Sequence, residues 1–501
     1  MRHLLLILTL AFAWIFCVVP SEAALTSDTV WEVRRAGDVT NGGCYDTGAS
    51  GTDYSQQDVA QVTYSDLVIG VTTTEVTSVS DPFGATSVGN CISIIAGVGC
   101  TISRRQVVSV SVVTATLDDS AGTAGSTCDA KLGGALGGIS AWGGFQAQVL
   151  PGNTIYIKAD ATYTNTATIA ALTVPGTTAL PIKWIGYTTT RGDGGNAVPG
   201  ATFTSATNSV ALVTLNAAHY NQFYHLKFTH TAATRGICVS FVTADSDFVS
   251  MDHILFDGCL NGVSLASTAD DFSLTNSTIL NTTGHCVTQT TSNQNFYGWN
   301  MFYNCGAGAG TFHGINVAAA SATSLKVTGN MFVSASGDGI SITNASGNPE
   351  FTAIGNGFKD NGSDGIAIGL SAIAGRSVLA NNIFWSNGAY GFTTAGLSDQ
   401  LITNFNNAYG DNGTDARNNL SAGTGDVTIT VDPWTDCDAS LVCTLNNTAG
   451  GGAALRATGI PGAFGGVGNT STTGYPDIGP VQHQDAGGST TILVPGGPVG
   501  F

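Results

Sequence analysis

A glycine recurs after a polar turn through the middle of the chain, and the residues before it include several that can do chemistry. In chain order these residues are Arg235, Asn261, Thr283, His313, Asp338, Asp364 and Tyr390. Asp338 and Asp364 lie 26 residues apart. If the chain repeats at this interval, the two carboxylates stack. They then repel each other, share a proton with one raised pKa, or hold a cation.

Four of these residues are the predicted ligand-binding group: His313, Asp338, Asp364 and Tyr390. An aromatic ring beside carboxylates suits a sugar, and carboxyl groups about 5 Å apart match the separation in retaining glycosidases. Asp338 and Asp364 are also the predicted ligands of a calcium ion, the one cofactor that the sequence suggests. The alternative explanation is that turn positions before glycine favour Asp and Asn for backbone reasons.

A repeat of short strands must position these side chains. Triplets of Asn, any residue and an aromatic begin at Asn300, Asn330, Asn356, Asn382 and Asn407, at spacings of 30, 26, 26 and 25 residues. Between them, apolar and polar residues alternate with period 2, which is typical of strands. A fixed period of this length built from strands predicts a parallel β-helix. Inward apolar residues would stack in columns, and each Asn amide would bond the Asn of the next coil.

With its flanking segments, this pattern resembles the right-handed parallel β-helix proteins of the pectate-lyase-like superfamily. Residues 151–157 look like the opening strand, residues 181–187 look like the next coil, and residues 477–482 resemble a closing motif. The resemblance covers roughly residues 132–485. It implies an all-β fold but no single activity, because the superfamily includes lyases, hydrolases, adhesins and phage spikes.

Two enzymatic alternatives come from this resemblance. Lyases of the superfamily use calcium and an Arg or Lys base. Here residues 249–253 resemble a short Asp-His motif, but no basic residue stands in a matching motif. Polygalacturonase-like enzymes carry an Asp pair, a Gly-His-Gly and an Arg-Ile-Lys on successive coils. Asp270-Asp271 and Gly284-His285 are present, but they are less than one coil apart and the Arg-Ile-Lys is missing. No catalytic set is complete.

The net charge and the N-terminal sequence indicate which partners and which cellular location to expect. The formal net charge of −18 disfavours nucleic acid and anionic membranes as partners. Residues 1–23 carry Arg2 and His3, an apolar run and small residues before Ala23, which predicts a secretory signal peptide. No later segment is apolar for long enough to span a membrane. We therefore expect a protein that is secreted or held at the cell surface.

The predicted fold class is all-β: a right-handed parallel β-helix solenoid with a small β-rich module near the N-terminus and an irregular C-terminal cap. After the signal peptide we expect an N-terminal segment over residues 24–61 and the β-rich module over residues 62–130. The β-helix is predicted over residues 131–424, the cap over residues 425–486 and a flexible tail over residues 487–501.

Ten cysteines remain after the signal peptide, and in an exported chain an even number predicts disulfides. Two of them follow a glycine by two residues and two follow a phenylalanine by three, which predicts the pairs Cys238–Cys259 and Cys286–Cys305 between adjacent coils. Local loops predict Cys91–Cys100 and Cys437–Cys443, and elimination then leaves Cys44–Cys128.

The functional prediction is an exported carbohydrate-binding or adhesive surface module whose partner is an extracellular polysaccharide or cell-surface glycan. Polar columns along a rigid rod suit extended glycan chains. The alternative is a polysaccharide lyase or glycoside hydrolase that acts on an extracellular polysaccharide.

Overall fold

The computed structural model describes most of the chain. It describes residues 25–138, 145–166, 171–193, 200–242, 245–265, 269–290, 293–308, 310–318, 324–343, 350–369, 377–395, 402–437, 443–456, 458–459 and 477–481. The predicted signal peptide and tail therefore lie outside the described residues. The chain divides into two compact units, one formed by residues 1–32 and 36–136 and the other by residues 33–35 and 137–501.

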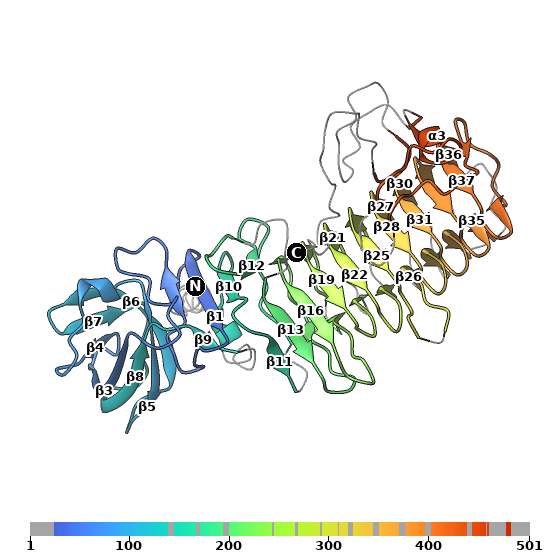
Figure 1. The fold of residues 1–501 in the computed structure, drawn as a ribbon. Coiled ribbons are helices and arrows are strands. Elements are labelled where there is room, and N and C mark those ends of the chain that lie inside the picture. Colours follow the sequence, from blue (N-terminus) through green and yellow to red (C-terminus); the bar gives the residue numbers. More distant parts are fainter. Residues whose placement is uncertain are drawn as a thin grey trace, which may run out of the picture. The chain divides into compact units, whose positions relative to one another are not determined.

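The first unit contains a closed antiparallel barrel with the strand order β3-β4-β7-β6-β5-β8 (Figure 1). Its strands are β3 (Val62–Ile69), β4 (Glu75–Thr77), β5 (Cys91–Ala96), β6 (Ser103–Ser111), β7 (Thr114–Leu117) and β8 (Gly125–Leu132). Inward residues such as Leu67, Ile92 and Leu132 are fully buried. The Val and Thr alternation in this segment therefore forms a small β-rich module with its own core.

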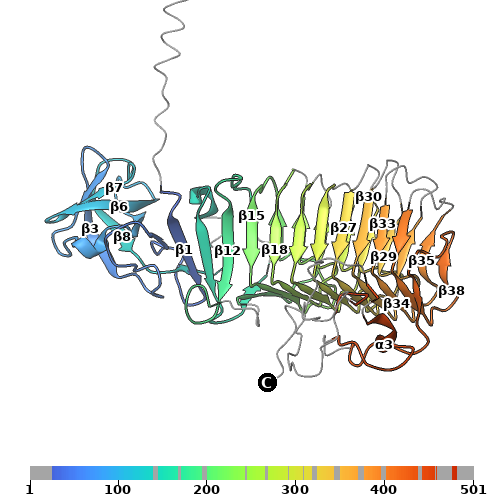
Figure 2. The same cartoon turned by 90° about the horizontal axis from the view of Figure 1, so that it is seen from above.

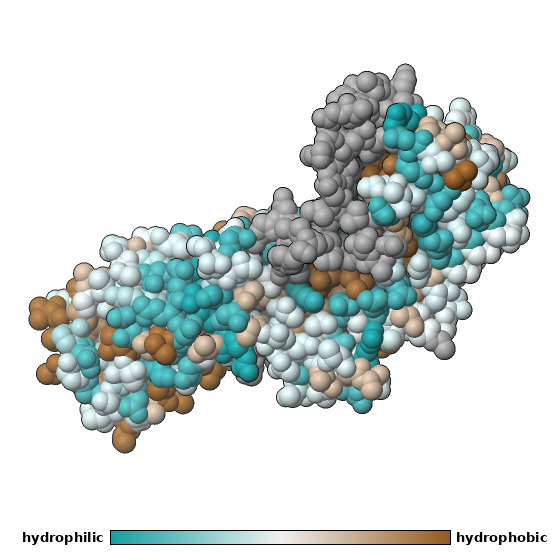
Figure 3. Space-filling model, viewed as in Figure 1, coloured by the Kyte–Doolittle hydropathy of each residue, from teal (hydrophilic) through white to brown (hydrophobic). Residues whose placement is uncertain are grey.

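The surface of this unit carries apolar residues on its turns (Figure 3). Val71 in the β3–β4 turn is 93% exposed, and Val98 and Val112 in the two turns that flank β6 are each 86% exposed. Short β1 (Thr29–Arg34) and β2 (Cys44–Asp46) precede the barrel and pair antiparallel through Thr29–Trp31.

The second unit is a parallel β-helix of three sheets, in which each strand pairs with its equivalent one coil later (Figure 2). The first sheet contains β10 (Thr154–Lys158), β12 (Ile182–Tyr187), β15 (Asn221–Tyr224), β18 (Ser250–Asp252), β21 (Ser273–Thr275), β24 (Asn295–Gly298), β27 (Ser324–Thr328), β30 (Glu350–Ile354), β33 (Ser377–Ala380) and β36 (Ile402–Phe405). The second contains β11 (Tyr163–Asn165), β13 (Thr202–Ser205), β16 (Lys227–His230), β19 (Leu255–Asp257), β22 (Thr278–Leu280), β25 (Met301–Tyr303), β28 (Met331–Val333), β31 (Gly357–Lys359), β34 (Ile383–Trp385), β37 (Ala408–Gly410) and β39 (Val427–Thr428). The third contains β14 (Val213–Leu215), β17 (Val239–Phe241), β20 (Val263–Leu265), β23 (Val287–Gln289), β26 (Ile315–Val317), β29 (Ile340–Ile342), β32 (Ile366–Ile368), β35 (Tyr390–Thr394) and β38 (Asp415–Asn418). The predicted fold class is confirmed, with about nine turns.

The Asn-x-aromatic triplets hold successive coils together, as the repeat predicted. Each triplet Asn donates its Nδ2 hydrogen to Oδ1 of the next, at 2.9–3.0 Å from Asn300 through Asn407. The same Oδ1 atoms also accept the backbone N–H of the preceding Asn. The aromatic rings stack from Phe302 to Tyr409 with centroids 4.6–5.0 Å apart. One residue type at one position therefore satisfies a buried bend in every coil.

The C-terminal segment covers an apolar outer face of the second sheet. Met301, Met331 and Ile383 point away from the solenoid interior and pack in one buried cluster with Trp434 and Ile478. A short helix, α3 (Gly452–Leu455), contributes Leu455 to the same cluster. In the described residues, the cap therefore lies along the outer face of this sheet.

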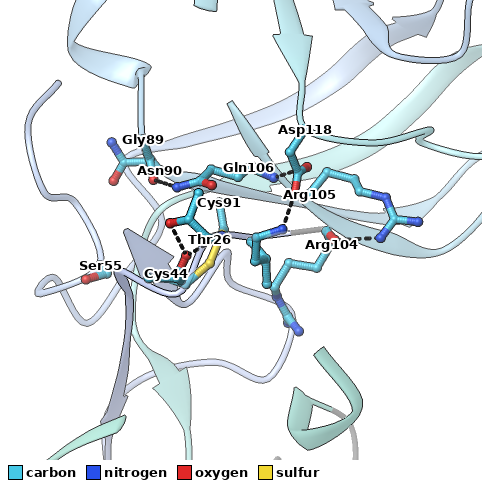
Figure 4. The surroundings of a disulfide bond; sticks show 12 residues. Thr26, Cys44, Ser55, Gly89, Asn90, Cys91, Arg104, Arg105, Gln106 and Asp118 are labelled. Atoms are coloured by element: carbon cyan, nitrogen blue, oxygen red, sulfur yellow. Dashed lines mark hydrogen bonds between the residues drawn. A yellow bond between two sulfur atoms is a disulfide. The ribbon is translucent and has the colours of Figure 1, made fainter. Parts of the chain in front are cut away.

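Three of the five disulfides pair as predicted: Cys238–Cys259, Cys286–Cys305 and Cys437–Cys443. The predicted pairs Cys91–Cys100 and Cys44–Cys128 are wrong. The first unit instead forms Cys44–Cys91, shown in Figure 4, and Cys100–Cys128. Cys91 begins β5 and Cys100 follows its far end, so the extended strand separates these near neighbours in sequence.

The register explains both disulfides of the first unit. Tyr45 forms an antiparallel bridge with Asn90, which places Cys44 beside Cys91. Ala96 pairs with Asp129, so the loop after β5 returns to β8 beside Cys128. This register cannot be predicted from how close the cysteines lie in the sequence.

The inter-coil disulfides should stabilise the solenoid. Cys286 and Cys305 are fully buried and close a loop with a sequence separation of 19 residues. We expect Cys286→Ala with Cys305→Ala to lower the free energy of unfolding by about 3 kcal/mol, because the cross-link restricts the unfolded chain. Urea unfolding measures this. An unchanged midpoint relative to the wild type in its oxidised form would contradict the prediction.

Candidate functional site

The predicted ligand-binding residues stack at the start of the third sheet. Ile315 pairs with Ile340, Ile340 with Ile366, and Ile366 with Phe392. The residues two positions earlier therefore lie on successive coils, and these are His313, Asp338, Asp364 and Tyr390. The structure brings all four together in one column.

Of the upstream members of the predicted series, Asn261 stands in this column, but Arg235 and Thr283 do not. Val287 pairs with Ile315, so His285 and not Thr283 stands in register with His313. Val239 pairs with Val263 in the same way, which places Ile237 and not Arg235 beside Asn261. Counting from the glycine fails here because Gly284 lies three residues before its strand, whereas Gly314 directly precedes its own. Counting back two residues from the first apolar residue of each strand, here Val287, would have found His285.

Hydrogen bonds connect the column from coil to coil. Nδ1 of His285 accepts the N–H of His313 at 2.9 Å, and Nδ1 of His313 accepts the N–H of Asp338 at 2.9 Å. The same relation continues through the carboxyl oxygens. Oδ1 of Asp338 accepts the N–H of Asp364 at 3.0 Å, and Oδ1 of Asp364 accepts the N–H of Tyr390 at 2.8 Å. Acceptor side chains at this position therefore satisfy the backbone, as the alternative explanation proposed.

The two histidines are held in their neutral form. Because Nδ1 of His285 accepts a hydrogen bond, the neutral ring carries its proton on Nε2. Burial, and then the neighbouring His313, lower the pKa of His285 to about 4. Burial also lowers the pKa of His313, although the Asp338 carboxylate, 3.2 Å from its Nδ1, opposes this.

Asp364 is the member of the column with acid character. Burial raises its pKa to about 6; the N–H of Tyr390 opposes this and the charge of Asp338 adds to it. The residue is 7% exposed. Its Oδ1 is bonded to Tyr390, whereas Oδ2 has no hydrogen-bond partner in the described part of the chain. Asp364 therefore offers one uncommitted carboxyl oxygen, and its carboxyl group is protonated below about pH 6.

Metal binding at this column stays a prediction. Calcium takes six to eight oxygen ligands. Among the described residues, no group of three or more His, Cys, Asp or Glu side chains is arranged to hold a metal ion. One oxygen of Asp338 and one of Asp364 already accept backbone hydrogens. The two carboxyl groups would need ligands from elsewhere to complete a calcium site.

The outer face of the third sheet continues from this column. Its central outward residues are Thr214, Ser240, Ser264, Thr288, Asn316, Ser341, Ala367, Thr393 and Asn418. All are small or medium in size, and all but Ala367 carry a hydrogen-bonding group. They repeat once per coil, about 4.8 Å apart. The column and this face together place polar side chains along the solenoid, of which Thr214, Ser240, Ser264 and Ser341 are at most 9% exposed.

The other sequence candidates lie elsewhere. Asp270 and Asp271 precede β21 of the first sheet, whereas His285 precedes β23 of the third, so the polygalacturonase-like combination is not assembled. Burial, and then the charges of Asp247, Asp271 and Asp245, raise the pKa of Asp270 despite a hydrogen bond from Asn293. Asp252 and His253 do meet, with 2.6 Å between Oδ2 and Nδ1, on the first sheet.

Known proteins resemble this chain only in structure. No family model matches the sequence, and no curated protein does. Pectate lyase Pel9A aligns with a TM-score of 0.44 at 14% identity, over 70% of this chain and 92% of its own. An alginate lyase from Paenibacillus sp. str. FPU-7 aligns with a TM-score of 0.41 at 14% identity, over 58% and 95%. A GH87 α-1,3-glucanase from Streptomyces thermodiastaticus aligns with a TM-score of 0.31 at 12% identity, over 74% and 96%. The assignment as a β-helix rests on the three stacked parallel sheets themselves.

Proposed function

We propose that this protein is exported and binds an extracellular polysaccharide lengthwise along the outer face of the third sheet. The rise of one coil is close to the length of one sugar residue in an extended chain, so equivalent polar groups meet successive sugars. The five disulfides support export, because disulfides persist in oxidising compartments. Within the described residues, no helix has the length and hydropathy of a membrane span.

The observation that carries the proposal is that Asp364, on this face, has a carboxyl oxygen without a hydrogen-bond partner among the described residues. An uncommitted carboxyl oxygen with a pKa of about 6 donates a hydrogen bond to a sugar oxygen when protonated and accepts one from a sugar hydroxyl when ionised. Tyr390, half-buried on the next coil, adds an aromatic ring beside it. Adhesion to a glycan-coated surface is the cellular role that we propose for such binding.

Glycoside hydrolysis is the second candidate. Asp338 and Asp364 lie on adjacent coils, and their separation of about 5 Å along the stack is close to that of the carboxyl pair in retaining glycosidases. A general acid with a pKa near the working pH fits this chemistry. Asp364 has the required pKa, which is the specific observation in favour of catalysis.

A blocking substitution on the third sheet tests the binding proposal. Ala367 is a small outward residue between Ser341 and Thr393, so Ala367→Arg should fill the face without entering the core. We expect affinity for the bound polysaccharide to fall about 30-fold or more in native affinity gels. Thr403→Arg, on the exposed face of β36 in the first sheet, is the matched control and should bind like the wild type. Equal binding by both variants would overturn the proposal.

The catalytic candidate is tested by a different measurement, the release of reducing ends. If Asp364 is the acid, Asp364→Asn should abolish the release of reducing ends from the bound polysaccharide while binding persists. Release by the variant at the wild-type rate would exclude the catalytic candidate. A wild type that binds and releases nothing would leave binding as the function.

A further inference from the structure

The outer face of the first sheet holds a second group of side chains arranged for a ligand. Tyr224, Asp252, Thr275, Gly298 and Thr328 stand in register on successive coils. The residue after each begins the bend into the second sheet and has a positive φ. These bend residues are His225, His253, Asn276, Trp299 and Gly329. The strands that carry them lie side by side between β15 and β27 in Figure 2.

Phe296 and Trp299 form an aromatic pair on this face. Both are half-buried, and their ring centroids lie 5.9 Å apart at 76°. Glycines lie close to both rings: a Cβ at Gly298 would come within 2.6 Å of Cζ of Phe296, and one at Gly329 within 2.7 Å of Cδ1 of Trp299. Any larger residue at these two positions would displace the rings. The backbone is therefore shaped to let the two aromatic rings lie across the sheet.

Two coils before this pair, Asp252 fixes the ring of His253. Oδ2 of Asp252 lies 2.6 Å from Nδ1 of His253, while Oδ1 accepts hydrogen bonds from Thr275 and Asn276, each at 2.7 Å. Burial opposes ionisation of Asp252, but these hydrogen bonds outweigh it and lower its pKa. The carboxylate therefore accepts the proton of Nδ1, and Nε2 is the ring nitrogen left available to a ligand. Nε2 has no hydrogen-bond partner among the described residues.

The aromatic pair and the fixed histidine are spaced for one carbohydrate chain. Asp252 pairs with Thr275 and Thr275 with Gly298, so the two features lie two coils apart, about 10 Å along the solenoid. A pyranose places its apolar C–H face on an aromatic ring and offers hydroxyl groups to fixed acceptors. The charges on the face are mixed, with Asp252 at one end and Lys326 beside Phe296, 5.5 Å from its ring centroid. With a net charge of −18 on the chain, this balance favours a neutral glycan over a polyanion.

We infer that the outer face of the first sheet, from Tyr224 to Lys326, is a second glycan-binding site, which takes a neutral polysaccharide through Phe296, Trp299 and His253. The inference extends the proposed function, since both faces take a glycan, but it depends on a different sheet and different residues. Binding at the two faces is therefore separable by substitution.

The test uses native affinity gels that contain hydroxyethylcellulose, galactomannan or soluble β-1,3-glucan, with polygalacturonate as the anionic arm. We expect Trp299→Ala to weaken binding to at least one neutral glycan by about 30-fold. His253→Gln keeps a donor for Asp252 but removes the ring Nε2, and it should weaken the same binding about 3- to 10-fold. Phe248→Ala is the matched aromatic control, because Phe248 is 45% exposed and stacks on Tyr220 at the other end of these strands.

Each outcome decides between the two sites. Loss of neutral-glycan binding in Trp299→Ala but not in Phe248→Ala or Ala367→Arg supports the first-sheet site whether or not the third sheet binds. Loss only in Ala367→Arg supports the third sheet and overturns this inference. The inference is also overturned if the wild-type protein binds none of the neutral glycans. It is overturned as well if Trp299→Ala binds them as tightly as the wild type and has an unchanged melting temperature.

Discussion

Replacing Asn356 by Ala should destabilise the solenoid by about 4 kcal/mol, because the substitution leaves several buried polar groups without partners. Oδ1 of Asn356 accepts both the N–H and the Nδ2 hydrogen of Asn330, and its own Nδ2 donates to Val327 and Asn382. Asn356 is fully buried, so water cannot replace these bonds without opening the coil. Thermal unfolding followed by circular dichroism measures the loss.

Asn418→Ala is the matched control for this experiment. Asn418 ends the third sheet, is half-buried and donates to Oγ1 of Thr393 at 3.1 Å. Its removal should cost about 1 kcal/mol, the ordinary value of a hydrogen bond accessible to water. Equal effects of the two substitutions would show that the stacked Asn amides do not hold the coils together.

Replacing Asp364 by Asn should stabilise the protein at pH 7.5 and leave it unchanged at pH 4. The folded-state pKa of Asp364 is about 6, above the unfolded value of about 4. The folded state therefore binds the proton more tightly, and this stability is present below pH 4 and lost as the pH rises through 6. Asn cannot ionise and keeps an oxygen for the N–H of Tyr390. The gain at pH 7.5 should reach about 3 kcal/mol at most.

His285 should change the stability with pH in the opposite direction from Asp364. Its pKa of about 4 lies below the unfolded value of about 6.5, so its contribution to stability is present above pH 6.5 and lost as the pH falls to 4. His285→Asn should therefore relieve destabilisation at pH 4, where Asp364→Asn has no effect. Denaturation midpoints at pH 4, 5.5 and 7.5 separate the two. A destabilised Asp364→Asn at pH 7.5 would show that the surroundings of Asp364 do not raise its pKa.

The sequence repeat was enough to predict most features of the solenoid. The spacing of Asn330, Asn356 and Asn382 predicted the coil length, the amide stack and the aromatic stack, because each depends on one residue type at one place in every coil. The same spacing brought Asp338 and Asp364 together. In the regular coils, position in the repeat is equivalent to position in space.

Prediction failed where the coils are irregular or where the fold is not periodic. The glycine before His285 lies outside its strand, and a count from that glycine chose Thr283 for the column. In the first unit, strand register and not proximity in the sequence pairs Cys44 with Cys91. Phe296 and Trp299 carried no signal because Gly329, which lies close to Trp299, becomes its neighbour only when the coils stack.

The central claim is that a polysaccharide lies along the outer face of the third sheet. A crystal structure of the protein soaked with an oligosaccharide of its tightest-binding polysaccharide tests this most directly. The account predicts sugar density over the third sheet between His313 and Tyr390, with a sugar oxygen within hydrogen-bond distance of Oδ2 of Asp364. Density confined to another face of the solenoid or to the barrel, with the third sheet bare, would contradict it.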